Sequence, residues 1–352
     1  MFCSDLHSTL VPILAEYDPE QIAVVYDRSV PHITETLGLP MDRSMGMDIS
    51  ETVKTMDSVS RIWDFLFEQG MTRRGLLIAV GGGVLTDMAG FAAATYKRGI
   101  DYVNIPTSFL AMVDASSGGK TGINYHGLKN SIGVFAPPVE TLIWPGWLAT
   151  LPSQQFLNGF AEMLKTGLIE STEYRVQSTD FLWERLLGYD LERMDIAALT
   201  PLIESCVRAK ESIVTADPLE KGLRKVLNFG HTFGHALEEV QMVNGKWSNG
   251  KWLHGYAVLY GMIAELYLSV TKLGCPKEPL QQLTQLMIHY YGRPQCKCSD
   301  REQLITLMKQ DKKNERTAQI NCTLIRNIGE PVINQVISRD EALEAFDYLF
   351  SL

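Results

Sequence analysis

The stretch LLIAVGGGVLTDMAG, residues 76–90, is the part of the sequence that most directly indicates a fold. Five apolar residues predict a short buried strand, three glycines follow, and helical spacing begins after them. In a turn of this kind, backbone N–H groups and the dipole of the following helix favour a pyrophosphate. A tight turn in any α/β protein has the same pattern, and Thr86 stands where the dinucleotide fingerprint has its third glycine. Both interpretations remain open at this point.

The regions on either side of this stretch alternate between strand-like and helical patterns. Short apolar runs at 22–26 and 102–105 predict two further strands, and residues 59–67 and 88–96 have the spacing of helices. Such alternation is typical of a parallel sheet that is covered by helices. We therefore predict an α/β domain over residues 1–152.

The pattern changes after Leu151-Pro152, where strand-like runs nearly disappear. We therefore predict a second, mainly helical domain over residues 153–352. Two late runs, 319–325 and 331–336, predict a small hairpin within it. The helical pattern is clearest in four segments: 156–169, 201–215, 226–240 and 257–273.

Composition and charge exclude several classes of protein. The 352 residues are 45% hydrophobic and 21% charged, which allows a large core and favours two domains. The net charge of -9 disfavours a nucleic-acid partner, because phosphate binding requires a basic surface. No segment approaches the ~20 apolar residues of a membrane span, and the N-terminus lacks a basic lead-in. Six cysteines without a CxxC pair predict reduced thiols. We expect a cytoplasmic protein with no nucleic-acid or membrane partner.

A histidine pair occurs in NFGHTFGH, residues 228–235. His231 and His235 are four residues apart and share one helical face, so both could bind a metal, or one could bind it while the other faces a substrate. His254 and Glu162 complete a set of metal-binding residue types. A zinc peptidase would need glutamate where Thr232 stands, which disfavours peptide hydrolysis. A hydrogen-bonded helix face without metal is the alternative.

Residues 114–130, DASSGGKTGINYHGLKN, combine small residues with Lys120, Lys129 and Asn130, and we predict that they form a loop. Small residues let a ligand approach the backbone, and the lysines and the amide would bind phosphate or carboxylate oxygens. Solvated surface lysines would have the same appearance. Four further cations lie near the glycine-rich or histidine-bearing segments: Arg98, Lys165, Lys210 and Arg224. Together with Lys120 and Lys129, these cations predict a pocket for an acidic metabolite.

Seven stretches follow one another along the chain: GGGVLTDMAGFAAATYKRG (81–99), IPTSFLAMVDASSGGKTGIN (105–124), GLKNSIG (127–133), FAEMLKTGLI (160–169), LRKVLNFGHTFGHALE (223–238), LHG (253–255) and DKKN (311–314). Together, and in this order, they resemble the 3-dehydroquinate synthase family of the sugar phosphate cyclase superfamily. The resemblance implies a Rossmann-like, nucleotide-binding N-terminal domain, a helical metal-binding C-terminal domain and a homodimer.

The resemblance also implies an activity. The family converts 3-deoxy-D-arabino-heptulosonate 7-phosphate to 3-dehydroquinate and phosphate, in the shikimate pathway of aromatic amino acid biosynthesis. The implied steps are oxidation by NAD, phosphate elimination, re-reduction, ring opening and an internal aldol closure. The implied cofactors are therefore NAD and one divalent metal, zinc or, in its place, cobalt.

Individual roles follow from the same resemblance. Zinc would be held by Glu162, His231 and His254, with His235 facing the substrate. The residues implied for NAD are Asp27, Glu51, Lys54, Gly82, Gly83, Asp87, Thr107, Ser108, Lys120, Lys129, Thr150 and Leu151. Those implied for substrate binding and catalysis are Arg98, Asp114, Lys120, Asn130, Lys165, Lys210, Arg224, Asn228, His235 and Lys312, with Lys313 as the alternative to Lys312.

Three positions depart from the family pattern. Thr86 lies in the glycine turn, Tyr256 follows LHG where glutamate is common, and Trp144-Pro145 replaces an acidic residue. The first affects the NAD turn, and the second affects the outer contacts of His254.

Other activities fit the same sequence. They are a cyclase that makes a deoxy-inosose or a valiolone, a metal-dependent polyol dehydrogenase, and a zinc-stabilised scaffold without catalysis. A structural zinc usually has four protein ligands, whereas the implied set has three, which disfavours the scaffold.

Overall fold

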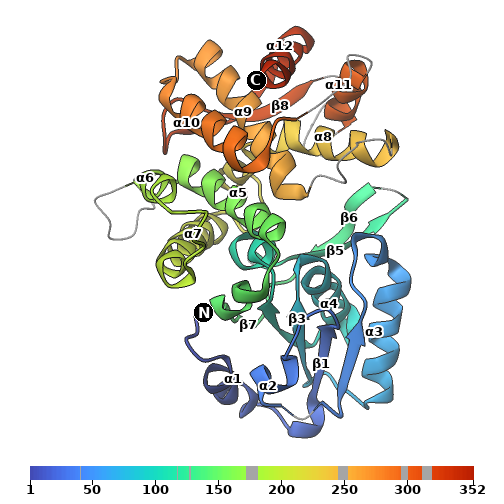
Figure 1. The fold of residues 1–352 in the computed structure, drawn as a ribbon. Coiled ribbons are helices and arrows are strands. Elements are labelled where there is room, and N and C mark those ends of the chain that lie inside the picture. The colour runs from blue at the N-terminus through green and yellow to red at the C-terminus, as the bar shows by residue number, and fades with distance from the viewer. Residues whose placement is uncertain are drawn as a thin grey trace. The chain divides into compact units, whose positions relative to one another are not determined.

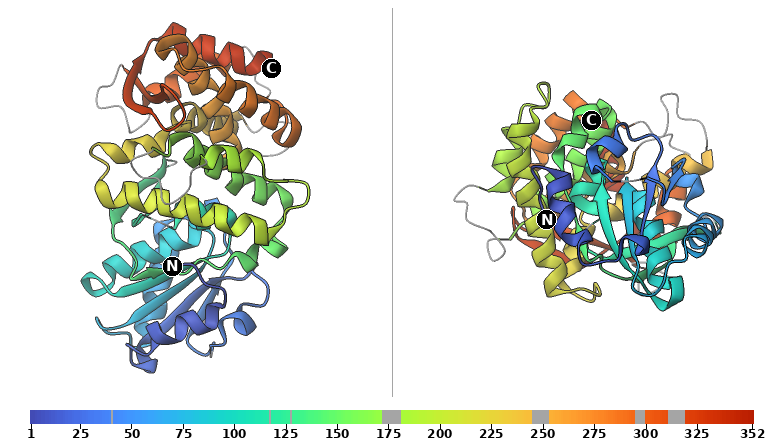
Figure 2. Two further views of the ribbon diagram at one scale, coloured as in Figure 1. Left: turned by 90° about the vertical axis from the view of Figure 1, so that its left-hand side faces the viewer. Right: turned by 90° about the horizontal axis from the view of Figure 1, so that it is seen from below.

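The computed structural model describes residues 1–39, 41–116, 118–126, 128–171, 181–244, 253–294, 300–310 and 319–352. The chain divides into two compact units, Met1–Pro152 (unit 1) and Ser153–Leu352 (unit 2). Figures 1 and 2 show the sheet within unit 1 and the predominance of helices in unit 2. Among the described residues, no helix has both the length and the hydropathy needed to cross a bilayer.

Unit 1 contains a five-stranded sheet in which every strand pair is parallel. The strand order is β2-β1-β3-β4-β7. All six residues of the central β3 are buried, as expected for a strand covered on both faces. The parallel sheet predicted from the alternating pattern is thus confirmed. The strands are β1 (Ile22–Asp27), β2 (Ser44–Met47), β3 (Leu76–Gly81), β4 (Asp101–Pro106) and β7 (Glu140–Thr141).

Two helices cover one face of this sheet. Alternate residues of the central strands, Ala23 and Val25 of β1 and Leu77 and Ala79 of β3, belong to one buried cluster with apolar residues of α3 and α4. The hydrophobic periodicity therefore fixes which side of each strand faces the helices. The helical segments of unit 1 are α1 (Leu6–Leu14), η1 (Pro19–Gln21), α2 (Ile33–Leu37), η2 (Glu51–Val53), α3 (Met56–Glu68), α4 (Gly83–Thr95), η3 (Tyr96–Arg98), the π-helix η4 (Ala111–Ala115) and η5 (Pro145–Thr150).

The region from 114 to 130 is not the loop that the sequence predicts. Its second half belongs to an antiparallel ribbon of β5 (Lys120–Tyr125) and β6 (Leu128–Phe135). A Cβ atom on Gly133 would lie 2.0 Å from the Thr121 carbonyl oxygen, so this glycine allows the two backbones to pair closely. The loop prediction was wrong because strand pairing overrides the low strand propensity of these small residues.

Unit 2 is built around α9, whose residues are buried on nearly all sides. It packs against α5, α8, α12 and β8. The antiparallel hairpin predicted near the C-terminus is confirmed. The helical segments of unit 2 are α5 (Ser153–Ile169), α6 (Leu182–Leu187), α7 (Ile196–Ala216), η7 (Leu223–Asn228), α8 (His231–Asn244), α9 (His254–Leu273), α10 (Glu278–Leu286), the π-helix η8 (Met287–Tyr291), α11 (Arg301–Gln310) and α12 (Arg339–Ser351), and the hairpin strands are β8 (Ile320–Ile325) and β9 (Pro331–Ile337).

The predicted helix over residues 226–240 is interrupted. The chain forms η7 up to Asn228, turns at Gly230 with a φ of +80°, and begins α8 at His231. The interruption has a packing cause, because a Cβ atom on Gly261 of α9 would lie 1.9 Å from the Gly230 carbonyl oxygen. The close approach of α9 to this turn therefore places His231 at the first position of its helix.

Candidate metal centre

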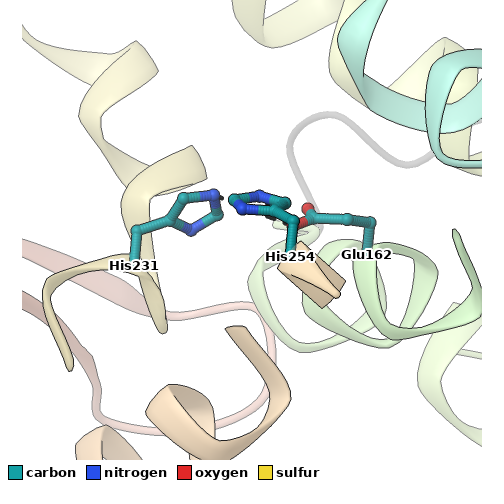
Figure 3. Close-up of side chains that lie close together, drawn as sticks. All are labelled: Glu162, His231 and His254. Carbon is teal, nitrogen blue, oxygen red and sulfur yellow. Dashed lines mark ion pairs between the residues drawn. The ribbon is translucent and has the colours of Figure 1, made fainter. Parts of the chain in front are cut away.

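Three helices of unit 2 bring Glu162, His231 and His254 together. Glu162 lies in the middle of α5, whereas His231 and His254 are the first residues of α8 and α9. One ligand atom from each residue lies within 4.8 Å of the others. Figure 3 shows the carboxylate and the two imidazoles directed toward one another. The three residues implied by the family resemblance thus converge from segments far apart in sequence.

The spacing of these atoms fits a divalent ion. Oε1 of Glu162 lies 3.7 Å from Nε2 of His231 and 3.5 Å from Nε2 of His254. An ion with bonds of about 2.1 Å in tetrahedral geometry separates its donors by roughly 3.4 Å. Among the described residues, the group consists of two imidazoles and one carboxylate, with no thiolate and no fourth protein donor. Such a set is typical of catalytic rather than structural zinc.

Hydrogen bonds orient both imidazoles. Nδ1 of His231 lies 3.1 Å from the Phe229 carbonyl oxygen, and Nδ1 of His254 lies 3.3 Å from Oε2 of Glu238. Each contact occupies Nδ1 of the imidazole, so that Nε2 faces Glu162. Outer-shell partners orient metal-binding histidines in the same way. Glu238, rather than residue 256, therefore supplies the outer contact of His254. The ring of Tyr256 packs against Tyr291 instead.

Two carboxylates of this region were missed from the sequence. Glu238 follows His231 by seven residues, a spacing that returns to the same helix face and could have signalled it. Glu265 of α9 is fully buried, and its Oε2 accepts a hydrogen bond of 2.6 Å from the Gly230 N–H. That bond fixes the turn directly before His231, and nothing in the local sequence indicates it.

A buried lysine accompanies the carboxylate of Glu162. Nζ of Lys165 lies 2.5 Å from Oε2 of Glu162, and both side chains are only 1% exposed. The ammonium group balances the carboxylate charge in this buried environment. Oε1 is the oxygen that faces the two histidines. The resemblance implies a substrate contact for Lys165, and the structure places its ammonium group beside a proposed metal ligand.

The carboxylates also change the protonation of His254. Burial alone would lower its pKa, but hydrogen bonds and charges from Glu162 and Glu238 raise the pKa to about 10. The two carboxylates therefore attract positive charge to the place where His254 meets Glu162. A metal ion bound there would compete with that proton.

The second histidine of the pair lies beside this group. The ring centroid of His235 is 5.3 Å from that of His231 and 6.1 Å from that of His254. It does not belong to the set of atoms that could share an ion. This arrangement matches the interpretation in which one histidine binds the metal and the other lies next to it.

The other substrate residues implied for unit 2 have mixed environments. Lys210 and Arg224 are buried, and Nη1 of Arg224 donates to the Pro218 carbonyl oxygen over 2.8 Å. Asn228 Nδ2 donates to Oε1 of Glu220 over 2.8 Å, so Glu220 is a further polar residue that the sequence did not single out. Lys312 and Lys313 lie outside the described residues, as does the segment 245–252 between α8 and α9.

In unit 1, the glycine turn lies where parallel sheets bind ligands. The turn follows the carboxyl end of β3, and the Thr107 N–H donates to the Gly81 carbonyl oxygen over 3.0 Å. A Cβ atom on Gly82 would lie 3.3 Å from Oγ of Ser108, and one on Gly81 would lie 3.4 Å from Cβ of Asp27. The structure thus brings together residues implied for NAD at the end of β1, in the turn after β3 and in the segment after β4.

Thr86 is compatible with this turn. Its side chain is buried, and Oγ1 donates to the Gly83 carbonyl oxygen over 3.2 Å within the first turn of α4. The hydroxyl is therefore satisfied by the helix backbone.

A polar network lies beside the turn. Nζ of Lys54 is 2.5 Å from Oδ2 of Asp87 and also contacts Oδ1 of Asn130. Burial raises the pKa of Asp87, and the charge of Lys54 opposes that rise. Oε1 of Glu51 accepts a hydrogen bond of 2.7 Å from Asn124, a residue to which the sequence assigned no role.

The remaining residues implied for unit 1 are more dispersed. Lys120 is exposed at the start of β5, Lys129 is half-buried in β6, and Asp114 is half-buried in the π-helix. Thr150 and Leu151 lie at the end of η5.

Arg98 lies at the opposite end of α4 from the glycine turn. It follows α4, which begins at the glycine turn, and α4 has 13 residues. At about 1.5 Å per residue this helix spans roughly 20 Å, so Arg98 lies near the amino end of β4. Within unit 1, α4 therefore separates Arg98 from the glycine turn by its full length, and the role of Arg98 stays a prediction.

The architecture of the two units defines the class of protein: it is the fold of the sugar phosphate cyclases. A structure of 2-epi-5-epi-valiolone synthase from Streptomyces hygroscopicus subsp. jinggangensis, with NAD+ and Zn2+ bound, superposes with a TM-score of 0.84 at 28% identity and covers 100% of this chain and 96% of that chain. A structure of 2-deoxy-scyllo-inosose synthase complexed with carbaglucose-6-phosphate, NAD+ and Co2+ shares the fold with a TM-score of 0.80 at 22% identity, over 99% of this chain and 95% of that chain.

Sequence comparison identifies the family within this class. Residues 44–158 match the N-terminal part of 3-dehydroquinate synthase, and residues 159–314 match its C-terminal part. The 3-dehydroquinate synthase of Parabacteroides distasonis is 38% identical over 353 residues, which cover 99% of this chain and 96% of that protein. The chain belongs to the 3-dehydroquinate synthase family, and the resemblance seen in the seven stretches is thereby confirmed.

Proposed function

We propose that the protein converts 3-deoxy-D-arabino-heptulosonate 7-phosphate to 3-dehydroquinate and phosphate, as a phosphorus–oxygen lyase. The observation that carries this proposal is the convergence of Glu162, His231 and His254 in a chain of this family. Three donors of these types suit a catalytic ion, with zinc as the first choice and cobalt as the second. NAD is the second cofactor.

The residues around the proposed metal site have distinct tasks. A divalent ion held there would supply Lewis acidity, which eases loss of a proton from a substrate hydroxyl during oxidation. Lys165 balances the charge of Glu162, and Glu238 keeps Nε2 of His254 directed at the carboxylate. These contacts set the donors in place before any ligand arrives, which lowers the cost of binding.

The glycine turn and its neighbours are proposed to hold NAD. The N–H groups at the start of α4 would bind the pyrophosphate, because helix N-termini favour anions. Asp27 at the end of β1, Ser108 and the Lys54–Asp87 pair surround this turn and its helix. Their proximity within one unit supports the assignment.

The cations are proposed to bind the carboxylate and phosphate of the substrate. Lys210 and Arg224 are buried, and Lys120 and Lys129 lie on the β5–β6 ribbon. Fixed positive charges would stabilise the negative charge that develops on the departing phosphate. In this proposal the phosphate also accepts the proton during its own elimination, so no separate carboxylate base is required.

A direct assay tests the proposal. Purified protein is mixed with the heptulosonate phosphate, a catalytic amount of NAD and Zn2+, and phosphate and 3-dehydroquinate are measured together. We expect equal amounts of both products and no net consumption of NAD. If well-folded protein releases neither product, the proposed activity is wrong.

The competing activities give different results in the same assay. A cyclase of the inosose or valiolone type would act on sugar phosphates that lack the carboxylate, such as glucose 6-phosphate. A polyol dehydrogenase would reduce NAD stoichiometrically and release no phosphate. We also propose a cytoplasmic homodimer, and light scattering of the purified protein tests the dimer.

A further inference from the structure

We propose that Asn124 is a positioning residue that fixes a bulge in the β5–β6 ribbon and joins it to the NAD-binding residues Glu51 and Lys54. The bulge carries Lys129 and Asn130. The inference deepens the proposed function, since it depends on NAD binding at this network.

The pairing of the ribbon shows the bulge. Ile123 pairs with Ile132 and Tyr125 pairs with Leu128, so the single residue Asn124 on β5 faces three residues on β6. The extra residues bend the strand, and such bulges often redirect side chains next to binding sites. The three residues on β6 are Lys129, Asn130 and Ser131.

The bulge places Asn130 in an uncommon backbone conformation. Its φ is +49°, in the left-handed region that asparagine tolerates better than most residues. The Asn130 N–H donates to Oδ1 of Asn124 over 2.9 Å. The Asn124 side chain thus holds the backbone of the residue that carries the left-handed turn.

Asn124 also contacts Glu51 of η2 and Lys54, which directly follows η2; both are assigned to NAD. Its Nδ2 donates to Oε1 of Glu51 over 2.7 Å, and its backbone N–H donates to the Lys54 carbonyl oxygen over 2.9 Å. The Lys54 ammonium group continues the network to Asp87 and to Oδ1 of Asn130. One side chain therefore links Glu51 directly to the bulge.

Asparagine suits this position because the amide donates and accepts at the same time. Leucine has a similar size but makes neither hydrogen bond. Aspartate keeps the acceptor for the Asn130 N–H, but it loses the donor and brings a second carboxylate to Glu51, near Lys54 and Asp87. Two adjacent carboxylates share one proton, so this variant would regain a donor when the pH falls.

The experiment compares NAD affinity in wild type, Asn124→Leu and Asn124→Asp by calorimetry at about pH 6 and about pH 8.5. The control is Asn327→Asp, an exposed residue in the β8–β9 turn of unit 2 that undergoes the same charge change. We expect Asn124→Leu to bind NAD about tenfold more weakly at both pH values, the effect of one or two lost hydrogen bonds. Asn124→Asp should bind NAD about tenfold more weakly at the higher pH and should recover most of the wild-type affinity at the lower pH. Wild type and control should show no such recovery.

Two outcomes separate the inference from the proposed function. If wild type binds NAD and both Asn124 variants bind it within twofold at both pH values, Asn124 has no positioning role. If wild type itself binds no NAD, the proposed function fails and the inference fails with it. Should Asn124→Leu unfold, the pH dependence of Asn124→Asp still decides, because a general loss of stability would not be reversed by acid.

Discussion

The proposed metal site of unit 2 is formed by helices and is largely buried. The polar network beside the glycine turn of unit 1 is formed by turns and a ribbon and includes exposed residues. Glu162 and Lys165 are 1% exposed, but Asn130 lies on the surface of its ribbon. The buried group is spaced for a compact ion, whereas Gly82 and Gly83 of the glycine turn are only half-buried. We therefore expect the two sites to fail independently when each is changed.

The largest effect should come from Glu162. Glu162→Gln replaces the carboxylate of the proposed metal site by a neutral amide, and it also removes the negative partner of Lys165. Zn2+ affinity should therefore fall by more than the 10–100-fold that is typical of changes to outer-shell residues. Unfolding free energy should drop by about 3–5 kcal/mol, because Lys165 stays charged and buried. Zn2+ calorimetry and chemical denaturation measure both quantities.

A second substitution separates metal binding from stability in this site. Adding Lys165→Met to Glu162→Gln should recover most of the stability and none of the Zn2+ affinity. NAD affinity should stay within twofold of wild type in both proteins. A large loss of NAD affinity would show that the two sites are not independent.

The converse test changes the glycine turn. Gly82→Val places a branched side chain next to Ser108, where a Cβ atom alone would lie 3.3 Å from Oγ. It should weaken NAD binding by at least about tenfold, because it blocks approach to the backbone N–H groups. Zn2+ affinity should be unchanged, and an equal loss of both affinities would contradict the comparison.

A smaller effect is expected at the outer contact of His254. Glu238→Gln keeps the size of the side chain but removes its charge, and Zn2+ affinity should fall by roughly 10–100-fold. The matched control is Glu192→Gln, which alters an exposed glutamate 3.6 Å from His289 and should change nothing. The visible spectrum of bound Co2+ gives a second readout of ligand geometry.

The smallest expected effect is the change in Zn2+ affinity for each unit of pH. The His254 pKa is raised from 6.5 to about 10, so its protonation stabilises the metal-free protein fully below about pH 6.5 and progressively less as the pH rises toward 10. Zn2+ must displace this proton, so affinity should rise by up to about tenfold per pH unit across that interval. Calorimetry in two buffers of different ionisation enthalpy counts the released proton, and zero release would exclude this coupling.

Much of the fold could be predicted because its hydrophobic periodicity is strong. The runs at 22–26, 76–80 and 102–105 became β1, β3 and β4, since a short apolar run that is almost fully buried in a parallel sheet has few alternatives. The ribbon of β5 and β6 could not be predicted, because its glycines have low strand propensity and gain their structure from each other. The turn at Gly230 depends likewise on the approach of α9, which lies more than 20 residues further along the chain.

The histidine spacing and the family resemblance identified candidate site residues, but the residues that support them were found only in three dimensions. Glu265 and Asn124 form hydrogen bonds to other segments, and local spacing does not reveal such contacts. For Glu238, the seven-residue spacing from His231 gives its helix face, but the contact with His254 depends on the packing of α8 against α9. Arg98 shows a related limit, since it is close in sequence to the glycine turn but lies at the far end of α4 from it.

The sequence by itself determined the two kinds of architecture and the types of donor available, because periodicity and side-chain chemistry are local properties. Tertiary structure decided which donors meet and how they are oriented. Glu162 and His254 are 92 residues apart, yet helix packing places their atoms at the spacing of ligands around one ion. Distances of that kind arise from the packing of whole helices, and no short segment of the chain contains them.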